Sequence, residues 1–320
     1  EDFITTLGLG LNTKYEGRRR SLDIAGRMNY RFNARRKDNK DIRNNSEHLN
    51  INFKNEFSVY DMINLKYTFN HSYAPGSFEE ELDRTTGERE TFENRFNADY
   101  TRNISEHFKF DTRYTHRLKE FSEENRKDSS LNIIAFDIRY RPVIATTFLL
   151  TYAYERNNVN NEINRYAAGI KYYITNRLYF NGRAGWDRSF SGKTKKDKLN
   201  INASLTNEID ENSVASISYN KSEDFDSEGD DISGKWNVKG SLKRQLLKNL
   251  KTSLSGYYGE SAFNASGITN ALLGANLSLS YEVWEDMHVN LHYAYSDLDS
   301  TNKRRGYTRN AVTLSLYKSF

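Results

Sequence analysis

The 320-residue chain contains no cysteine and only two prolines. The lack of cysteine excludes disulfides, thiolate metal sites and cysteine nucleophiles. The scarcity of proline favours long hydrogen-bonded strands, because proline cannot donate a hydrogen bond to a β-ladder. The sequence also lacks any apolar run of about 18 residues, and this excludes a protein that crosses a membrane with helices.

The composition combines a polar average with many aromatic side chains. The mean hydropathy is −0.85 and 28% of the residues are charged, yet the chain has 22 tyrosines and 18 phenylalanines. The net charge is only +4, and the lysines and arginines are spread among acidic residues. This distribution gives no support to nucleic-acid binding, which requires cations gathered on one face.

The strongest pattern is an alternation of apolar and polar residues that recurs from end to end. In the stretch 22–33, Leu22, Met28 and Tyr30 fall on one face, and Asp23 and Arg27 fall on the other. Counting such stretches, beginning with residues 3–11, gives about seventeen strands of about ten to fourteen residues. A tilted strand that crosses a bilayer needs about nine to eleven residues, whereas a soluble strand has about five or six.

The connections alternate between short and long. Short turns fall at residues 60–61, 103–106 and 248–249, and longer polar connections at 74–90, 191–198 and 222–233. Short periplasmic turns and longer outer loops are typical of outer-membrane barrels. The sequence therefore predicts an all-β, transmembrane, antiparallel up-and-down β-barrel over residues 1–320, integral to a bacterial outer membrane and in contact with its lipid and lipopolysaccharide.

The direction of the strands can be counted backward from Phe320. If the last strand descends to the periplasm, residues 3–11 also form a descending strand. Because bacterial single-chain barrels have an even number of strands and a periplasmic N-terminus, we expect one more strand before Glu1 and about eighteen in the full protein. The alternative is that one hairpin has been miscounted.

Both ends of the chain resemble a known family. The segments ITTLGLGLNTKYEGRRRSLDIAGRMNYRF (residues 4–32) and YTRNAVTLSLYKSF (residues 307–320) are similar to the outer-membrane β-barrel family associated with exopolysaccharide gene clusters. In that family a strand commonly precedes the start seen here. The resemblance implies a role in exopolysaccharide export beside periplasmic and inner-membrane secretion components, and it supplies no catalytic residues.

The last strand also resembles the assembly signal of outer-membrane barrels, which end on an aromatic residue preceded by alternating apolar ones. Lys318 departs from this signal at a position where an apolar residue is common. The resemblance implies recognition by the outer-membrane barrel assembly machinery. The residues that fit the signal are Val312, Leu314, Leu316 and Phe320.

The face opposite the apolar stripe is predicted to line the lumen. From the second to the ninth strand, twelve cations on this face exceed six acids. These charges can hydrate the pore and pair across strands, or they can form a basic track that attracts an anionic solute or sugar polymer. Arg27, Arg31 and Arg35, the arginine ladder, recur about 13 Å apart without an intervening acid and are the leading candidates. The other cations are Lys54, Lys66, Arg95, Lys109, Arg113, Arg117, Arg139, Arg141 and Lys171.

Enzymatic and metal-binding signals are weak. GxSxG, HExxH and phosphate-binding glycine loops do not occur. His288 and His292 lie about 13 Å apart on a strand, too far to share one ion. Acidic clusters at 79–83 and 223–231 fit solvated loop tips, with divalent-cation bridging as the alternative. We therefore predict neither an enzyme nor a cofactor.

An eighteen-stranded barrel would have a backbone diameter of roughly 36 Å, wide enough for a polysaccharide chain. The leading hypothesis is an outer-membrane channel or conduit that secretes an exopolysaccharide. A general or anion-selective diffusion porin is the second hypothesis, with residues 74–90 as a possible constriction loop. A third is a sheath for another protein, such as an electron-transfer cytochrome.

Overall fold

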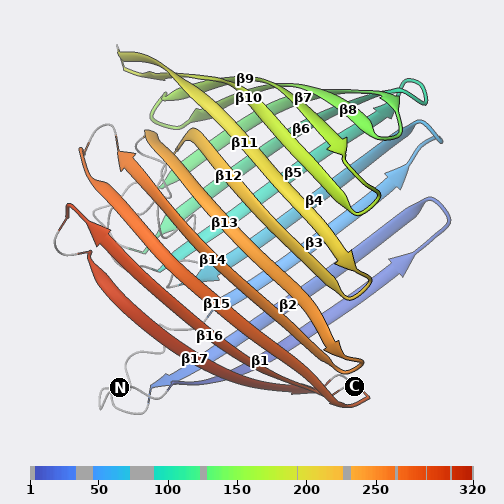
Figure 1. Ribbon diagram of the computed structural model, residues 1–320. Helices are drawn as coiled ribbons and strands as arrows, with labels where there is room; N and C mark the ends of the chain where they lie inside the picture. The colour runs from blue at the N-terminus through green and yellow to red at the C-terminus, as the bar shows by residue number, and fades with distance from the viewer. Residues whose placement is uncertain are drawn as a thin grey trace.

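The computed structural model describes residues 4–33, 46–72, 90–122, 128–192, 194–225, 232–263, 266–285, 287–302 and 305–318. These residues form one antiparallel sheet of 17 strands that curls around an interior (Figure 1). They contain no helix long and apolar enough to cross a membrane. The predicted all-β, up-and-down architecture and its count of seventeen strands are confirmed.

The strands are β1 (Ile4–Glu16), β2 (Arg20–Asn33), β3 (Ser46–Glu56), β4 (Asp61–Ser72), β5 (Thr91–Asn103), β6 (Phe108–Phe121), β7 (Ser129–Val143), β8 (Thr146–Asn157), β9 (Glu162–Tyr173), β10 (Leu178–Ser191), β11 (Thr194–Asp210), β12 (Ser213–Phe225), β13 (Ile232–Leu247), β14 (Leu250–Phe263), β15 (Thr269–Trp284), β16 (Met287–Ser300) and β17 (Tyr307–Lys318). Several exceed the predicted length, and β11 reaches 17 residues. A crossing needs only about nine to eleven residues, so the longer strands extend beyond the bilayer.

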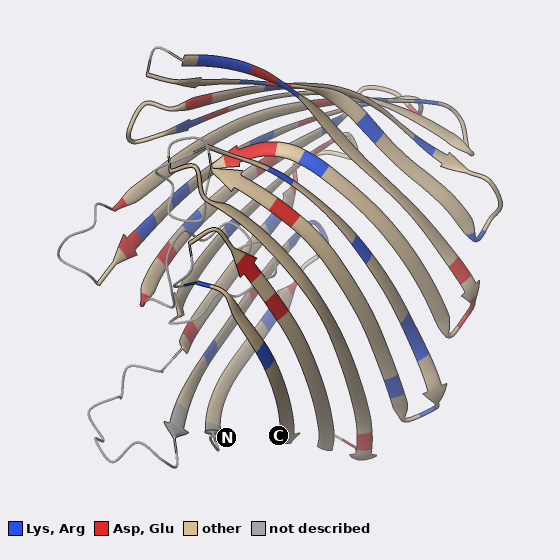
Figure 2. Cartoon of the chain, turned by 60° about the vertical axis from the view of Figure 1, so that its left-hand side comes forward, with Lys and Arg blue, Asp and Glu red and all other residues tan. Residues whose placement is uncertain are grey.

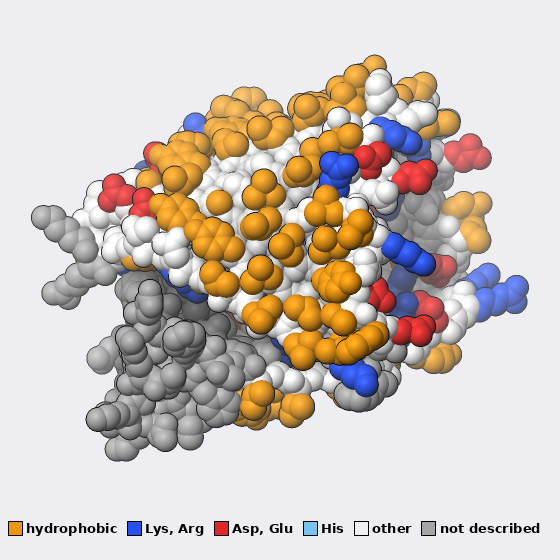
Figure 3. All heavy atoms as spheres, turned by 60° about the horizontal axis from the view of Figure 1, so that its bottom comes forward, with side chains coloured by type: hydrophobic (Ala, Val, Ile, Leu, Met, Phe, Trp, Pro, Cys, Tyr) orange, Lys and Arg blue, Asp and Glu red, His pale blue; other side chains and the backbone are white. Residues whose placement is uncertain are grey.

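The alternation in the sequence separates the two faces of the sheet. Leu22, Phe53 and Leu65 are cross-strand partners on β2, β3 and β4, so the apolar stripe of each strand continues on its neighbours. This exterior face carries exposed side chains such as Leu150 (58%) and Ile138 (47%). Figure 3 shows hydrophobic side chains spread over the outer surface. Exposed apolar area of this extent is stable in lipid and not in water.

Short turns join the strands at one end of the sheet, called here the short-turn end. Three of them repeat one device, in which a hydroxyl accepts hydrogen bonds from two backbone N–H groups just ahead. Ser58 accepts from Tyr60 and Asp61, and Ser105 and Thr175 do the same in their turns. Such side-chain-to-backbone bonds favour tight turns. The opposite, long-loop end carries the longer connections.

Consecutive strands pair from β1 through to β17, and within the described residues no ladder joins β1 to β17. The two edge strands carry highly exposed apolar side chains, with Leu9 and Leu314 both at 72%. With an odd number of up-and-down strands, β1 and β17 run in the same direction and cannot pair as antiparallel neighbours. The expected strand before Glu1 concerns residues outside this sequence and stays a prediction.

The interior is not uniformly open. Buried apolar residues form two clusters, and both lie at the long-loop end. One comprises Leu131, Ile163, Phe225 and Ile232, and the other centres on Leu272 and Leu298. Among the described residues, buried apolar packing is therefore concentrated at the long-loop end.

Candidate functional site at the long-loop end of the lumen

The predicted lumen cations within the described residues alternate along their strands with the residues of the exterior stripe. Arg27 is exposed on the lumen face, and its Nε donates to Asn29 Oδ1 at 2.9 Å. Arg31 occupies β2 opposite Thr6, and Arg35 lies outside the described residues. The transport role of the arginine ladder stays a prediction.

Most of the other predicted cations have an acidic neighbour. Nitrogen–oxygen distances are 2.7 Å for Lys54–Glu56, 2.8 Å for Arg95–Glu93, 2.7 Å for Arg113–Asp99 and 3.3 Å for Arg139–Asp111. Lys66 lies between Asn52 and Asn97 in the ladders, and Arg117 lies opposite Arg95. These partly exposed pairs contribute little stability. They make the wall a surface of mixed charge, in which Lys54–Glu56 and Arg95–Glu93 pair along one strand and the other two pairs cross between neighbouring strands.

The assembly-signal residues lie on the exterior of the last strand. Val312, Leu314 and Leu316 are 70%, 72% and 63% exposed. Phe320 lies outside the described residues. Recognition of this segment by the assembly machinery stays a prediction.

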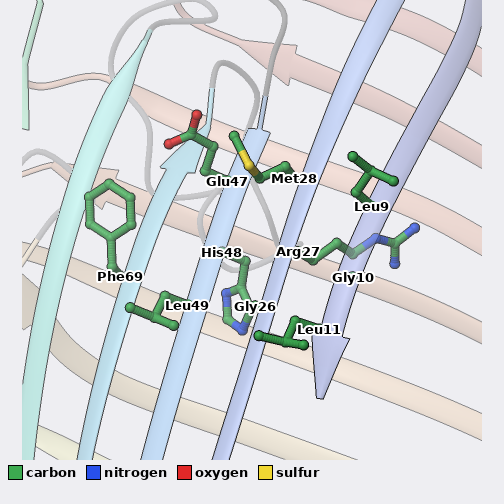
Figure 4. Close-up of a pocket in the computed structure, with 10 residues that line it drawn as sticks. All are labelled: Leu9, Gly10, Leu11, Gly26, Arg27, Met28, Glu47, His48, Leu49 and Phe69. Carbon is green, nitrogen blue, oxygen red and sulfur yellow. The ribbon is translucent and has the colours of Figure 1, made fainter. Parts of the chain in front are cut away.

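A groove of about 380 Å³ is lined by residues of β1–β4, among them Arg27 (Figure 4). Leu9 and Met28 are cross-strand partners, as are Gly26 and Leu49, so these residues share the exterior face. The groove lies beside Gly26, which has no side chain to fill it. Its apolar residues belong to the exterior face, whereas Arg27 and His48, which also line it, belong to the lumen face.

The most distinctive feature of the lumen is the end of hairpin β12–β13. The β11–β12 ladder stops at Ile201–Lys221, whereas the β10–β11 ladder continues to Ser191–Thr194. The two hairpin strands nevertheless stay paired as far as Phe225–Ile232. Residues 222–225 of β12 therefore part from β11, whereas β13 stays paired with β14 from Ser233 onward. Residues 222–225 and 232–235 are called here the hairpin tip. Figure 2 shows the acidic end of this hairpin curving inward below the uppermost strands.

Apolar contacts hold the hairpin tip against the opposite wall. Phe225 (4% exposed) and Ile232 (1%) pack with Leu131 (5%) and Ile163 (0%). Leu131 and Ile163 belong to β7 and β9, on the face opposite the exposed Ile134 and Tyr166. The tip consequently contacts the lumen face of strands that are not its neighbours in the sheet.

A buried carboxylate links the tip to the wall. Asp187, which is fully buried, accepts hydrogen bonds from Arg165 Nε at 2.9 Å, from Asn200 Nδ2 at 2.8 Å and from the backbone N–H of Glu223 at 2.8 Å. Arg165 in turn donates to the Glu223 carbonyl at 2.7 Å and pairs with Glu155 at 3.0 Å. Because buried charges require partners, these groups depend on one another.

The side chains of the tip add further ion pairs. Glu223 Oε1 lies 2.8 Å from Lys198 Nζ on β11, and Asp224 Oδ2 lies 3.1 Å from Lys235 Nζ on β13. A Cβ atom at Gly234 would lie 2.9 Å from Lys198 Nζ, so glycine lets the tip approach this lysine. The acidic segment beginning at residue 223 was expected to be a solvated loop tip, and for Glu223, which is 0% exposed, that expectation is wrong.

The second buried cluster lies along the wall formed by β14–β17. Leu272 and Leu298, on β15 and β16, pack with Tyr257 and Tyr307 of the adjoining strands. Beside them the Ser300 hydroxyl donates to Asn270 Oδ1 at 2.7 Å. Of the two clusters, only the one at the hairpin tip joins strands that are not neighbours in the sheet. Nearly all of the expected constriction loop, residues 74–90, lies outside the described residues, and the hairpin tip is a constriction that the sequence did not suggest.

The described residues show no arrangement of three or more His, Asp or Glu side chains able to hold a metal ion. No protein-family model matches the chain, and no curated protein matches its sequence. Solved structures do match its fold. With the FrpB iron transporter from Neisseria meningitidis (F5-1 variant) the TM-score is 0.60 at 12% identity, covering 100% of this chain and 65% of that one.

Two further similar structures are the copper transporter OprC and the ferric-catecholate import receptor Fiu from E. coli K12. Their TM-scores are 0.53 and 0.52 at 9% and 12% identity, and each match covers 100% of this chain. The chain spans 65% of the length of OprC and 68% of that of Fiu. The chain therefore shares the large antiparallel β-barrel fold of these proteins. Together with the apolar exterior, it indicates an integral protein of the bacterial outer membrane.

Proposed function

We propose that the chain forms a gated outer-membrane conduit through which a cell secretes an exopolysaccharide. The observation that carries the proposal is a lumen lined with paired charges that leads to a mouth closed by the hairpin tip. The proposal that the transported molecule is an exopolysaccharide rests on the resemblance of residues 4–32 and 307–320 to an exopolysaccharide-associated family. Periplasmic polysaccharide-export components are the proposed partners.

A wall of mixed charge suits a long polar polymer. Pairs such as Lys54–Glu56 and Arg113–Asp99 offer donors and acceptors to sugar hydroxyls at many points along β3–β7. Transport requires that each contact be weak enough to release the solute to the next one. Repeated weak contacts meet this condition better than a single strong site.

The packing of the hairpin tip at the mouth supports a gated route, which is closed until the tip moves. A diffusion porin keeps a permanent aqueous path, whereas the tip packs Phe225 and Ile232 against the far wall. An anion-selective porin remains the second candidate, favoured by the exposed Arg27 and the excess of cations on the face it shares. The names of FrpB and OprC describe iron and copper transport for those proteins, and here that function would need a ligand site beyond the ones described above.

Gene deletion and liposome swelling together test the proposal. Deleting the gene should abolish secretion of the polymer, and expression of the chain should restore it. Liposomes that contain the purified barrel should swell slowly in arabinose, because the mouth is closed. Unchanged polymer secretion after deletion, together with swelling as fast as that given by a diffusion porin, would favour the porin instead.

A further inference from the structure

The hairpin tip presents two neighbouring carboxylates to cations that belong to other strands. Glu223 pairs with Lys198 of β11 at 2.8 Å, and its backbone carbonyl accepts from Arg165 of β9 at 2.7 Å. Cations from two wall strands, β9 and β11, thus meet one acidic segment of the chain itself.

The wall and the tip divide the charges between them. The wall supplies Arg165 and Lys198, whereas the tip supplies Glu223 and Asp224 together with Lys235. Arg165 keeps two wall carboxylates of its own, Glu155 at 3.0 Å and Asp187 at 2.9 Å. Withdrawal of the tip would therefore leave Lys198 as the cation to be neutralised.

We propose that Arg165 and Lys198 form a carboxylate-binding site at the mouth, that Glu223, with Asp224 beside it, occupies this site in the closed state, and that an acidic sugar polymer displaces it. This inference rests on the proposed function and adds the class of cargo and the means of opening. The acid groups of the polymer take the place of the Glu223 carboxylate, and the end of β12 moves away from the wall.

The surroundings of the site favour an acidic sugar over a small inorganic anion. Beside the cations, the departing tip would uncover Leu131 and Ile163, which now contact Phe225 and Ile232. A sugar ring offers C–H groups to such apolar side chains while its carboxylate meets the cations. Sites that recognise organic ligands commonly combine apolar lining with a few placed polar groups.

Competition by the tip determines the expected affinities. The tip carboxylates are tethered to the barrel, so their effective concentration at the site is high, and a free oligosaccharide binds weakly while they are present. Neutralising the tip removes the competitor without altering the wall. Affinity for an acidic oligosaccharide should then rise, and affinity for a neutral one should not.

The test measures binding of fluorescent oligogalacturonate to the purified full chain in detergent micelles by fluorescence anisotropy. The double variant Glu223→Gln/Asp224→Asn should bind about tenfold more tightly than the wild type, which corresponds to about 1.4 kcal/mol. Adding Lys198→Gln to it should reverse the gain. The matched control Glu208→Gln/Glu282→Gln removes the same charge near the short-turn end and should bind like the wild type.

A maltodextrin of equal length serves as the neutral probe, and heat-modifiable migration checks folding. If the double variant does not fold, Glu223→Gln alone is used, with a smaller gain expected. Equal affinity of tip and control variants for oligogalacturonate, or an equal gain for maltodextrin, would overturn the proposal. Loss of export on gene deletion combined with either result refutes this site alone. A gain in acid binding without any export role refutes the proposed function and leaves the site intact.

Discussion

Asp187→Ala should open the mouth of the barrel without unfolding the sheet. Asp187 is fully buried and connects three elements through Arg165, Asn200 and the backbone of Glu223. A hydrogen bond to a charged group contributes about 1.5–3 kcal/mol, and breaking a buried ion pair costs about 3–5 kcal/mol. Arg165 keeps Glu155 as a partner, which limits the penalty.

We assign about 3 kcal/mol of this loss to the attachment of the tip, because the tip loses its own hydrogen bond and Arg165 becomes less restrained. That change shifts the opening equilibrium of the tip roughly 150-fold. The sheet should persist, because its ladders remain and only the long-loop end is affected. Single-channel recording in planar bilayers should then show a higher open probability than the wild type.

The matched control is Asp197→Ala. Asp197 pairs with Arg188 at 2.8 Å near the same end, but both side chains are 46% exposed, and such pairs contribute at most about 1 kcal/mol. Asp187→Asn, which keeps the volume and one acceptor, should give an intermediate open probability and provides a second test if the alanine variant folds poorly. Wild-type gating in folded Asp187→Ala and Asp187→Asn barrels would refute the role of this carboxylate.

Three further predictions address the wall. A cysteine at Leu150, 58% exposed on the exterior, should resist hydrophilic thiol reagents in membranes, and one at Thr151 should react; equal labelling would contradict the assignment of faces. Reversing all charges of the arginine ladder to Glu should shift reconstituted conductance toward cations and reduce export of anionic polymer in a folded barrel; no change in either would leave the arginines as hydration and pairing groups. Gly185→Val should abolish the heat-modifiable barrel, because a Cβ there would clash with the backbone oxygen of Tyr166 on β9, and normal assembly would show that β9 and β10 can separate.

The faces of the sheet could be predicted because each strand carries its own signal. In β4, Leu65, Tyr67 and Phe69 alternate with Lys66, Thr68 and Asn70. One face of such a strand contacts lipid and the other contacts water, so period 2 is enough to assign both. The ion pairs of the wall could be predicted only as an alternative to a basic track, because pairing depends on side-chain conformation.

The inward hairpin could not be predicted in the same way. Residues 223–231 are mostly acidic, and a polar segment carries no local signal for the direction in which it bends. One sign lies elsewhere, in β7, where Leu131 and Ile133 are apolar on the lumen face next to Ile134 on the exterior. Apolar residues on a face that should be wet indicate a contact, but they do not identify the partner 90 or more residues away.

The hairpin tip is held at the mouth by ion pairs and by apolar contacts, and an acidic sugar can replace both kinds of contact. Burying Phe225 and Ile232 stabilises the closed tip by about 1.5–3 kcal/mol for each side chain, similar to the contribution assigned to the Asp187 attachment. A small anion could compete for Lys198 but would leave the apolar contact intact, and an apolar molecule would leave the ion pairs intact. Only a ligand that replaces both contributions offsets the whole cost of opening, because an equilibrium shifts by no more than the difference in affinity for its two states. A polymer of acidic sugars has both properties in every repeating unit, so the same chain can displace the tip and hold the mouth open as it moves through.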